Sequence, residues 1–335
     1  MPEIRQNLVT TDWVIIATER AKRPEDFKKK DASLKIKEPL PEFENTCPFC
    51  PGNEKKMSPD ETLRIEKKGK WQVRIIPNKF PALSKTGERI RTVDGIKRKL
   101  TGVGLHEVVI ETPLHNLTTA LLPTDNVRNI IKSYKMRYNE MLEDKRIEMI
   151  IIFKNHGESA GTSLIHPHSQ IVATPVVPAP VRERFNNAKK YFDENFECVY
   201  CRVLSEELKD GSRIVLETKH FVSFIPYAAL SPFHCWIYPK RHYSSFGDIT
   251  EEEISDLAVN LQTTLKKYYY GLDNPDFNYV VRSAPADLKN LDFFHWYISI
   301  VPRITKTAGF ELGSGMFINS SLPENDAKFL RDIKI

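Results

Sequence analysis

Apolar and polar residues alternate in two stretches of the chain, and each stretch ends near a histidine. Residues 107–113 precede His115, and residues 235–239 precede His242. β-Branched and aromatic residues at every second position are typical of half-buried strands. We therefore expect one strand in each stretch.

An amphipathic helix is predicted after each of these strands. Thr250 and Glu253 have the spacing of a capping box, and Thr124 occupies the matching place 126 residues earlier. Apolar residues then recur at helical spacing, which predicts one buried face for each helix. They are Val127, Ile130, Ile131, Tyr134, Tyr138 and Met141 in the first helix and Ile254, Leu257, Ala258, Leu261, Leu265 and Tyr268 in the second.

Similar segments follow one another in the same order in both halves of the chain. A Cys-x-x-Cys pair comes first in each half, and the strand and helix described above follow it. Residues 166–172 then align without a gap with residues 295–301, at an offset of 129. We therefore expect a duplicated α+β fold with antiparallel sheets and packed helices, divided into residues 1–190 and 191–335.

The composition is typical of a folded protein and argues against general disorder and a membrane partner. The 335 residues carry a net charge of +5, with 41% hydrophobic and 28% charged residues, which excludes general disorder. Apolar runs stay far below the ~20 residues that span a bilayer, so we expect no membrane partner. The N-terminus shows no apolar signal core, which favours a cytoplasmic location. Two short basic runs, residues 28–30 and 97–99, are interpreted as solvated loops rather than nucleic-acid contacts.

The four paired cysteines indicate metal binding more than redox chemistry or buried thiols. Both pairs stand in turn-like contexts, and Cys₂His₂ is a common ligand set for zinc. The first expected set is Cys47, Cys50, His115 and one histidine of the pair His166 and His168. The second is Cys198, Cys201, His242 and His295, with His234 and Cys235 as nearby competitors.

One histidine is left over in the first half. Alternate strand residues face the same side, so His166 and His168 are expected to project together. The second half has Tyr297 in place of His168 and Ser299 in place of Gln170. This difference indicates one active and one inactive site. A neutral imidazole can attack phosphorus, and the Gln170 amide can donate to an oxygen on it.

Residues 155–163 form a predicted loop rich in glycine and hydroxyl residues, immediately before the two histidines. Its glycines permit close backbone approach, and its N–H groups and hydroxyls can bind phosphate oxygens. The loop matches neither a P-loop nor a dinucleotide-binding fingerprint. We expect it to be part of an anion site.

Eight motifs together resemble the galactose-1-phosphate uridylyltransferase branch of the histidine-triad superfamily. They are residues 12–17, 20–24, 47–50, 77–83, 155–163, 166–170, 239–242 and 309–311. The resemblance implies histidine-triad-like units, a homodimer with a shared active site, and a ping-pong reaction through a nucleotidyl-histidine. It implies zinc at both cysteine sites, with iron as the alternative at the second.

The resemblance also implies a role for individual residues. His168 is similar to the family nucleophile, Gln170 to the phosphate-binding amide and Ser163 to a phosphate donor. The ligands of the first metal site would be Cys47, Cys50, His115 and His166, and those of the second Cys198, Cys201, His242 and His295. Nucleotide or phosphate contacts are expected from Arg20, Arg23, Asn78, Asn155, Gly161 and Thr162, and an acceptor contact from Glu311.

The substrate is less clearly indicated. UMP transfer between UDP-glucose and a hexose 1-phosphate is the first expectation. Phe317 replaces an expected glutamine and Lys79 an expected aspartate, so AMP transfer, as in ADP-glucose phosphorylase, adenylylsulfate:phosphate adenylyltransferase and dinucleoside polyphosphate phosphorylases, is the alternative. A nucleotide hydrolase is the alternative from another enzyme class.

Overall fold

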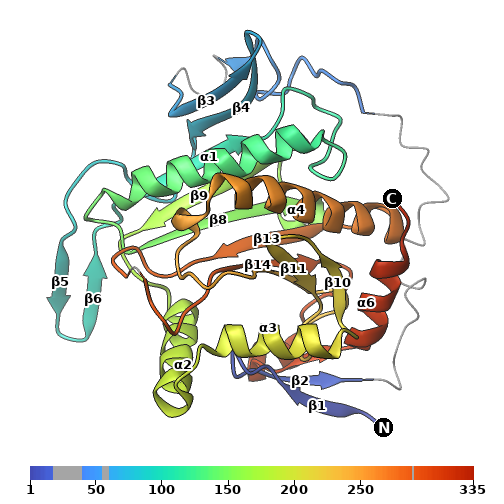
Figure 1. The fold of residues 1–335 in the computed structure, drawn as a ribbon. Helices are drawn as coiled ribbons and strands as arrows, with labels where there is room; N and C mark the ends of the chain where they lie inside the picture. Colours follow the sequence, from blue (N-terminus) through green and yellow to red (C-terminus); the bar gives the residue numbers. More distant parts are fainter. Residues whose placement is uncertain (18–39, 55–59, 289) are drawn as a thin grey trace.

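A long antiparallel sheet forms the centre of the molecule (Figure 1). The computed structural model describes residues 1–17, 40–54, 60–288 and 290–335, and these ranges contain a ten-stranded sheet. The first half supplies, in spatial order, β3 (Leu63–Lys67), β4 (Lys70–Pro77), β7 (Leu105–Ile110), β9 (His168–Thr174) and β8 (Met149–His156). The second half continues with β13 (Phe277–Arg282), β14 (Tyr297–Pro302), β12 (Cys235–Pro239), β11 (Phe221–Phe224) and β10 (Ile214–Glu217).

The strand order is the same in both halves when each is followed from its outer edge inward. β3, β4, β7, β9 and β8 correspond to β10, β11, β12, β14 and β13, and the halves join where β8 pairs with β13. The expected duplicated α+β fold is therefore confirmed. The division of the chain at residue 190 stays a prediction.

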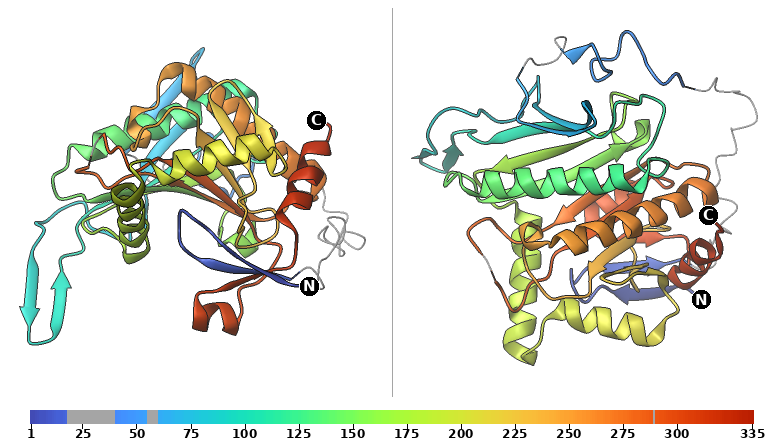
Figure 2. Two further views of the ribbon diagram at one scale, coloured as in Figure 1. Left: turned by 60° about the horizontal axis from the view of Figure 1, so that its bottom comes forward. Right: turned by 45° about the horizontal axis from the view of Figure 1, so that its top comes forward.

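Two long helices lie side by side on one face of the sheet (Figure 2). α1 spans Thr124–Leu142 and α4 spans Glu251–Gly271, and all twelve predicted core positions on them are buried. The Thr250–Glu253 capping box is present at the start of α4. Thr124 is not a cap: it is the first residue of α1 and donates to Gln262 Oε1 of α4 (2.7 Å).

In the second half, two helices cover the opposite face of the sheet. α2 (Ala179–Asn195) and α3 (Val199–Asp210) contribute to an apolar cluster with Val222, Trp236 and Tyr297 of that face. Over the first half, the loop that carries Cys47 and Cys50 packs in an apolar cluster on β4 and β7. His168 and Gln170 lie on β9, the strand next to β7. Among the described residues, helices thus pack on the second half of this face and the cysteine loop packs on the first half.

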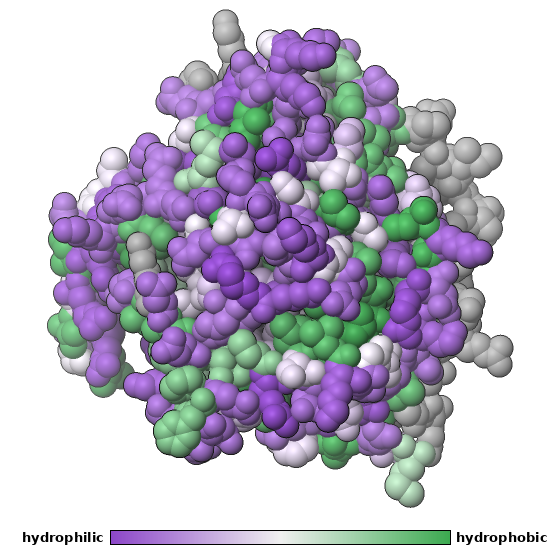
Figure 3. All heavy atoms as spheres, viewed as in Figure 1, coloured by the Kyte–Doolittle hydropathy of each residue, from purple (hydrophilic) through white to green (hydrophobic). Residues whose placement is uncertain are grey.

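The remaining elements lie around the central sheet and the helices that cover it. β1 (Glu3–Gln6), β2 (Trp13–Ile16) and β15 (Phe317–Asn319) form a small sheet, while β5 (Arg91–Asp94) and β6 (Lys97–Leu100) form a projecting hairpin (Figure 2). α5 (Gly309–Ser314) and α6 (Pro323–Asp332) are near the C-terminus. No helix in the described ranges is long and apolar enough to cross a bilayer. The face seen in Figure 3 is mostly hydrophilic, with apolar side chains gathered mainly between α4 and α3.

Candidate active site

The first predicted metal group is brought together by three separate segments. Cys47 and Cys50 lie in a turn, His115 follows β7, and His166 precedes β9. The ligand atoms of all four lie within 4.8 Å of one another. His166 Nδ1 is 3.6 Å from both Cys47 Sγ and Cys50 Sγ, and Cys50 Sγ is 3.6 Å from His115 Nδ1. His166 rather than His168 is therefore the histidine that completes this group.

Hydrogen bonds outside the group set the orientation of its ligands. His166 Nε2–H donates to the carbonyl oxygen of Thr112 (2.8 Å), which leaves the Nδ1 lone pair facing the cysteines. Burial lowers the pKa of His166 to about 4 and raises the pKa of Cys50 to about 11. A bound cation would hold the thiols in their deprotonated form.

The second group has the same design at the corresponding place. Cys201 Sγ is 3.2 Å from His242 Nδ1 and 3.5 Å from His295 Nδ1, and Cys198 completes the four. The Nε2–H groups of His242 and His295 donate to backbone carbonyls at 2.9 Å. A hydrogen bond from Cys201 lowers the pKa of Cys198 to about 5.

Two expectations about these cysteines need correction. Cys198 is not in a turn-like context, because it is the N-cap residue of α3, whose buried residues Val199, Tyr200 and Leu204 hold the helix against the sheet. The competitors for the second group also lie elsewhere. His234 contacts Ser299, and the Cys235 thiol contacts the carbonyl of Trp236.

His168 is the first residue of β9, so the strand starts two residues later than expected. Its Nδ1 lies 2.8 Å from the carbonyl oxygen of His166. An oxygen can only accept, so Nδ1 carries the hydrogen and Nε2 keeps its lone pair. Burial, with a further contribution from the charge on Lys154, lowers the pKa of His168. The ring packs edge-on against Phe49 of the cysteine turn, with centroids 5.4 Å apart.

A buried polar network holds the backbone of His168 from the helix side of the sheet. Lys154 Nζ donates to the carbonyl oxygen of His168 (3.1 Å) and to Glu111 Oε2 (2.8 Å). Thr119 donates to the same carboxylate, and Tyr134 donates to Ser169 (2.6 Å). The sequence reasoning missed this network, because Lys154 and Glu111 are far apart in sequence and each resembles an ordinary surface charge.

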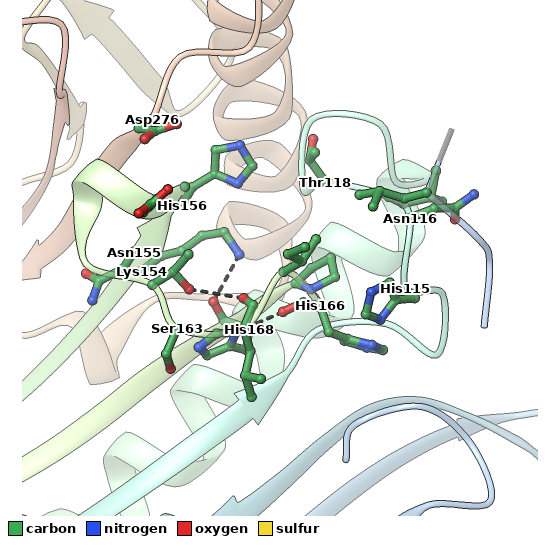
Figure 4. A pocket seen from close by; sticks show the side chains of 18 of the residues that line it. His115, Asn116, Thr118, Lys154, Asn155, His156, Ser163, His166, His168 and Asp276 are labelled. Atoms are coloured by element: carbon green, nitrogen blue, oxygen red, sulfur yellow. Dashed lines mark hydrogen bonds between the residues drawn. The ribbon is translucent and has the colours of Figure 1, made fainter. Parts of the chain in front are cut away.

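A cavity of about 800 Å³ opens beside His168 (Figure 4). Ser163 and Asn155 lie on the same side of it as His168, whereas His115 and Asn116 lie on the other. Thr162 also lines this cavity, as do Asn274 and Asp276 from the second half of the chain. The predicted nucleophile, loop and first metal group therefore surround one space.

Side chains from the second half position the predicted anion loop. Asp276 Oδ2 accepts from the backbone N–H (2.8 Å) and the hydroxyl (2.6 Å) of Ser159. Asn278 donates to Asn155 Oδ1 and to the carbonyl oxygen of Ala160, both at 2.8 Å. These contacts leave the Asn155 amide nitrogen available. Neither Asp276 nor Asn278 belongs to a recognisable motif, so no sequence pattern pointed to them.

The remaining predicted site residues make contacts of their own. Gln170 and Asn78 both contact His106 on β7, which the sequence reasoning did not single out. Gly161 has a left-handed backbone and ends the loop's short helical turn. Glu311 accepts from the backbone N–H of Ala308 at the start of α5 and is not among the described residues that line the cavity. Arg20 and Arg23 lie outside the described residues.

The corresponding place in the second half is closed. Tyr297 is buried, and its ring lies 5.0–5.9 Å from those of Trp236, Tyr238 and Tyr200. Tyr200 comes from α3, which covers this half of the face. The space that is open beside His168 is therefore filled by aromatic rings beside Tyr297.

Comparison with known proteins agrees with this geometry. The models for the N- and C-terminal domains of galactose-1-phosphate uridyl transferase match residues 1–178 and 184–313. An ADP-glucose phosphorylase of Arabidopsis thaliana is 38% identical over 338 residues, covering 100% of this chain and 93% of its own length. A galactose-1-phosphate uridylyltransferase of Thermotoga maritima is 28% identical over 345 residues, covering 100% and 99%.

A solved structure shares the same fold over its full length. The crystal structure of an ADP-glucose phosphorylase from Arabidopsis thaliana with bound ADP-glucose superposes with a TM-score of 0.84 at 34% identity, covering 100% of this chain and 99% of that one. Both kinds of relative are nucleotidyltransferases. The chain therefore belongs to the galactose-1-phosphate uridylyltransferase family, and it is a nucleotidyltransferase.

Proposed function

We propose that the chain transfers a nucleotidyl group through a covalent bond to His168. The observation that carries this proposal is the hydrogen bond from Nδ1 to the His166 carbonyl, which leaves the Nε2 lone pair on a ring that lines the cavity. Nε2 attacks the α-phosphorus, and the bond from phosphorus to the bridging oxygen breaks with its electron pair. An acceptor oxygen then attacks the same phosphorus, and the P–N bond breaks to regenerate His168.

The predicted site residues have corresponding roles in this proposal. Ser163 would donate to a phosphate oxygen, and phosphate contacts are also assigned to Gly161 and Thr162 of the same loop. The Gln170 amide would stabilise charge on the α-phosphate. Contacts to the nucleotide are assigned to Asn78 and Asn155, contacts to phosphate to Arg20 and Arg23, and the acceptor contact to Glu311.

We favour AMP transfer from an ADP-sugar to phosphate as the reaction, which reverses the order expected from the sequence alone. Identity to the ADP-glucose phosphorylase is 38%, against 28% for the Thermotoga uridylyltransferase. Lys79 and Phe317 also depart from the uridylyltransferase pattern. UMP transfer between UDP-glucose and a hexose 1-phosphate is the second candidate. Hydrolysis, with water as the acceptor, is the third.

We assign zinc to both Cys₂His₂ groups. Zn–S and Zn–N bonds of normal length in a tetrahedral site place sulfur and nitrogen about 3.6 Å apart. The sulfur–nitrogen distances are 3.6 Å in the first group and 3.2 and 3.5 Å in the second. Zinc would act as a structural ion here, since all four ligand positions are protein groups. Iron is the alternative in the second group.

A homodimer and a cytoplasmic location complete the proposal. A shared active site would account for Glu311, which is not among the described residues that line the cavity of its own chain. Light scattering after size-exclusion chromatography tests the dimer, and a mixture of His168→Gly and Glu311→Ala chains tests the sharing. Activity restored by mixing the two inactive variants would support a site built from both chains.

The central experiment is the intact mass of the protein after incubation with ADP-glucose or UDP-glucose alone. A mass increase equal to AMP or UMP identifies both the covalent intermediate and the base. His168→Gly should form no adduct, and added imidazole should restore part of the transfer to the acceptor. Tyr297→Phe, at the corresponding position of the second half, should form the adduct normally. An adduct on His168→Gly at the wild-type rate would refute the assignment of the nucleophile.

A further inference from the structure

His106 on β7 makes two hydrogen bonds that define which of its ring nitrogens carries hydrogen. The backbone N–H of Ala82 donates to Nδ1 (3.1 Å), so Nδ1 must be an acceptor. The hydrogen is then on Nε2, which lies 2.7 Å from Gln170 Oε1. His106 therefore donates to the side-chain carbonyl of Gln170.

The neighbouring asparagine does not offer His106 another acceptor. Asn78 Nδ2 lies 3.0 Å from His106 Nε2, but Asn78 Oδ1 already accepts from the backbone N–H of Phe80 (2.9 Å). Turning the Asn78 amide would break that bond. Gln170 Oε1 is the acceptor that remains for Nε2–H.

This bond determines which end of the Gln170 amide is free. An amide whose oxygen is already bonded presents its NH₂ group in the other direction. If the amide rotated, it would present oxygen, which repels the oxygens of a phosphate. We propose that His106 is a positioning residue that holds Gln170 with its NH₂ group available to the α-phosphate. This inference rests on the nucleotidyl transfer proposed above.

The same histidine also connects Gln170 to the loop that follows β4. Besides the Ala82 bond, the backbone N–H of Asn78 donates to the backbone carbonyl of His106 (2.8 Å). Residues 78–82, which include the proposed nucleotide contact Asn78, are thus fixed to the strand next to Gln170. The His106 side chain therefore contacts both the loop that contains Asn78 and the amide of Gln170.

In the second half, His234 and Ser299 correspond to His106 and Gln170, but the histidine nitrogen accepts a hydrogen bond instead of donating one. His234, 128 residues after His106, lies with Nε2 2.9 Å from the hydroxyl of Ser299, the counterpart of Gln170. There Trp236 Nε1–H donates to His234 Nε2 (3.1 Å), so that nitrogen is an acceptor. Both halves therefore have a histidine at this register. His106 donates through Nε2–H to Gln170, whereas Nε2 of His234 is an acceptor. His234 is a matched structural control.

Two substitutions separate the bonds that His106 makes. Glutamine can place an N–H donor near the position of Nε2, whereas asparagine can place an acceptor near the position of Nδ1. The rate of AMP or UMP adduct formation is measured with the nucleotide sugar alone, by rapid quenching and intact mass. We expect His106→Ala and His106→Asn to lower this rate by about tenfold or more, and His106→Gln to stay within about threefold of wild type.

Two controls distinguish positioning from a general structural role. His234→Ala should lower the melting temperature but leave the adduct rate within about twofold of wild type. In a Gln170→Ala background, His106→Ala should add less than a twofold effect, because the group that it positions is already absent. An undiminished effect in that background, or a wild-type rate for His106→Ala, would overturn the proposal.

The tautomer gives a test that does not depend on activity. Nitrogen-15 NMR of histidine-labelled wild-type protein should show His106 with hydrogen on Nε2, identified by the signal lost in His106→Gln. Hydrogen on Nδ1 would overturn the positioning role even if the enzyme transfers nucleotides. If the tautomer is as expected but wild type forms no adduct with either nucleotide sugar, the proposed function fails, and this inference about the reaction fails with it.

Discussion

Lys154 lies with its ammonium nitrogen 3.1 Å from the backbone oxygen of His168. Its other partner, Glu111, is fully buried. The charge and hydrogen bond of Lys154 outweigh the effect of burial and lower the pKa of Glu111. The backbone that carries the proposed nucleophile is therefore attached to a buried ion pair.

Replacing Lys154 by Met should destabilise the protein by about 3–5 kcal/mol, because it leaves the Glu111 carboxylate buried and unpaired. Urea unfolding monitored by fluorescence measures the loss. Replacing Glu111 by Gln in the same chain should recover part of it. Lys67→Met, which removes an exposed pair with Asp125 (3.1 Å), should cost less than about 1 kcal/mol. Equal effects of Lys154→Met and Lys67→Met would contradict the burial argument.

Gly157→Ala should reduce adduct formation while leaving the metal content intact. A Cβ at Gly157 would lie 2.1 Å from Asp276 Oδ1, and the residue has φ +84°. The carboxylate would have to leave Ser159, which releases the anion loop. Gly161→Ala is the matched control, because its φ is +88° but its nearest neighbour would be 3.8 Å away. We expect a loss of at least tenfold for Gly157→Ala and a smaller loss for Gly161→Ala, and the reverse order would be evidence against this account.

The two metal groups should differ in their consequences. Cys50→Ser should lower both stability and adduct formation, because Phe49 in the same turn packs on His168. Cys198→Ser should lower the melting temperature by a similar amount, about 10 °C, with a smaller effect on adduct formation. Elemental analysis should find two zinc ions per wild-type chain and one in each variant. Wild-type protein purified without chelator and free of metal would contradict both assignments.

Stability should depend on pH through Asp326, which lies in α6. Burial raises the pKa of Asp326 to about 7, above the value near 3.9 of an unfolded aspartate. The folded state therefore keeps a proton that the unfolded state releases, and this contribution to stability is present below about pH 4 and lost as the pH rises to 7.

Asp326→Asn keeps a neutral group at this position at every pH. Its carbonyl can still accept from the backbone N–H of Phe233, which lies 2.9 Å from Asp326 Oδ2. We expect the variant to gain up to about 4 kcal/mol of stability at pH 8 and to lose the dependence between pH 4 and pH 7. Denaturant unfolding at a series of pH values measures both. Asp332→Asn, at an exposed carboxylate, should leave the dependence between pH 4 and pH 7 unchanged.

Much of the fold follows from periodicity, because helix faces and strand alternation are local properties of the chain. Spacing and repetition predict the stripes on α1 and α4 and the second cysteine–histidine set, and they leave the first set open between His166 and His168. The structure brings both sets together, the first with His166. Strand β9 starts at His168, two residues later than the sequence predicts. Pro167 precedes it and has no N–H to donate to the sheet.

The supports of the site could not be found in the same way. Lys154, Glu111, Asn278 and Asp276 act through contacts between segments far apart in sequence. A lysine on a strand and a glutamate after one are compatible with solvent exposure until the tertiary pairing is known. His106 shows no motif either, because its role depends on its register beside Gln170 across the sheet.

The junction between β8 and β13 places Phe153 opposite Val280, and these two residues have the same register in their respective halves. Equivalent strands that meet antiparallel at equivalent residues are related by a two-fold axis. A single ancestral half could complete this sheet by pairing with another copy of itself, so the chain has the geometry of a dimer made permanent by fusion. Fusion lets one copy lose its nucleophile and still supply Asp276 and Asn278 to the other.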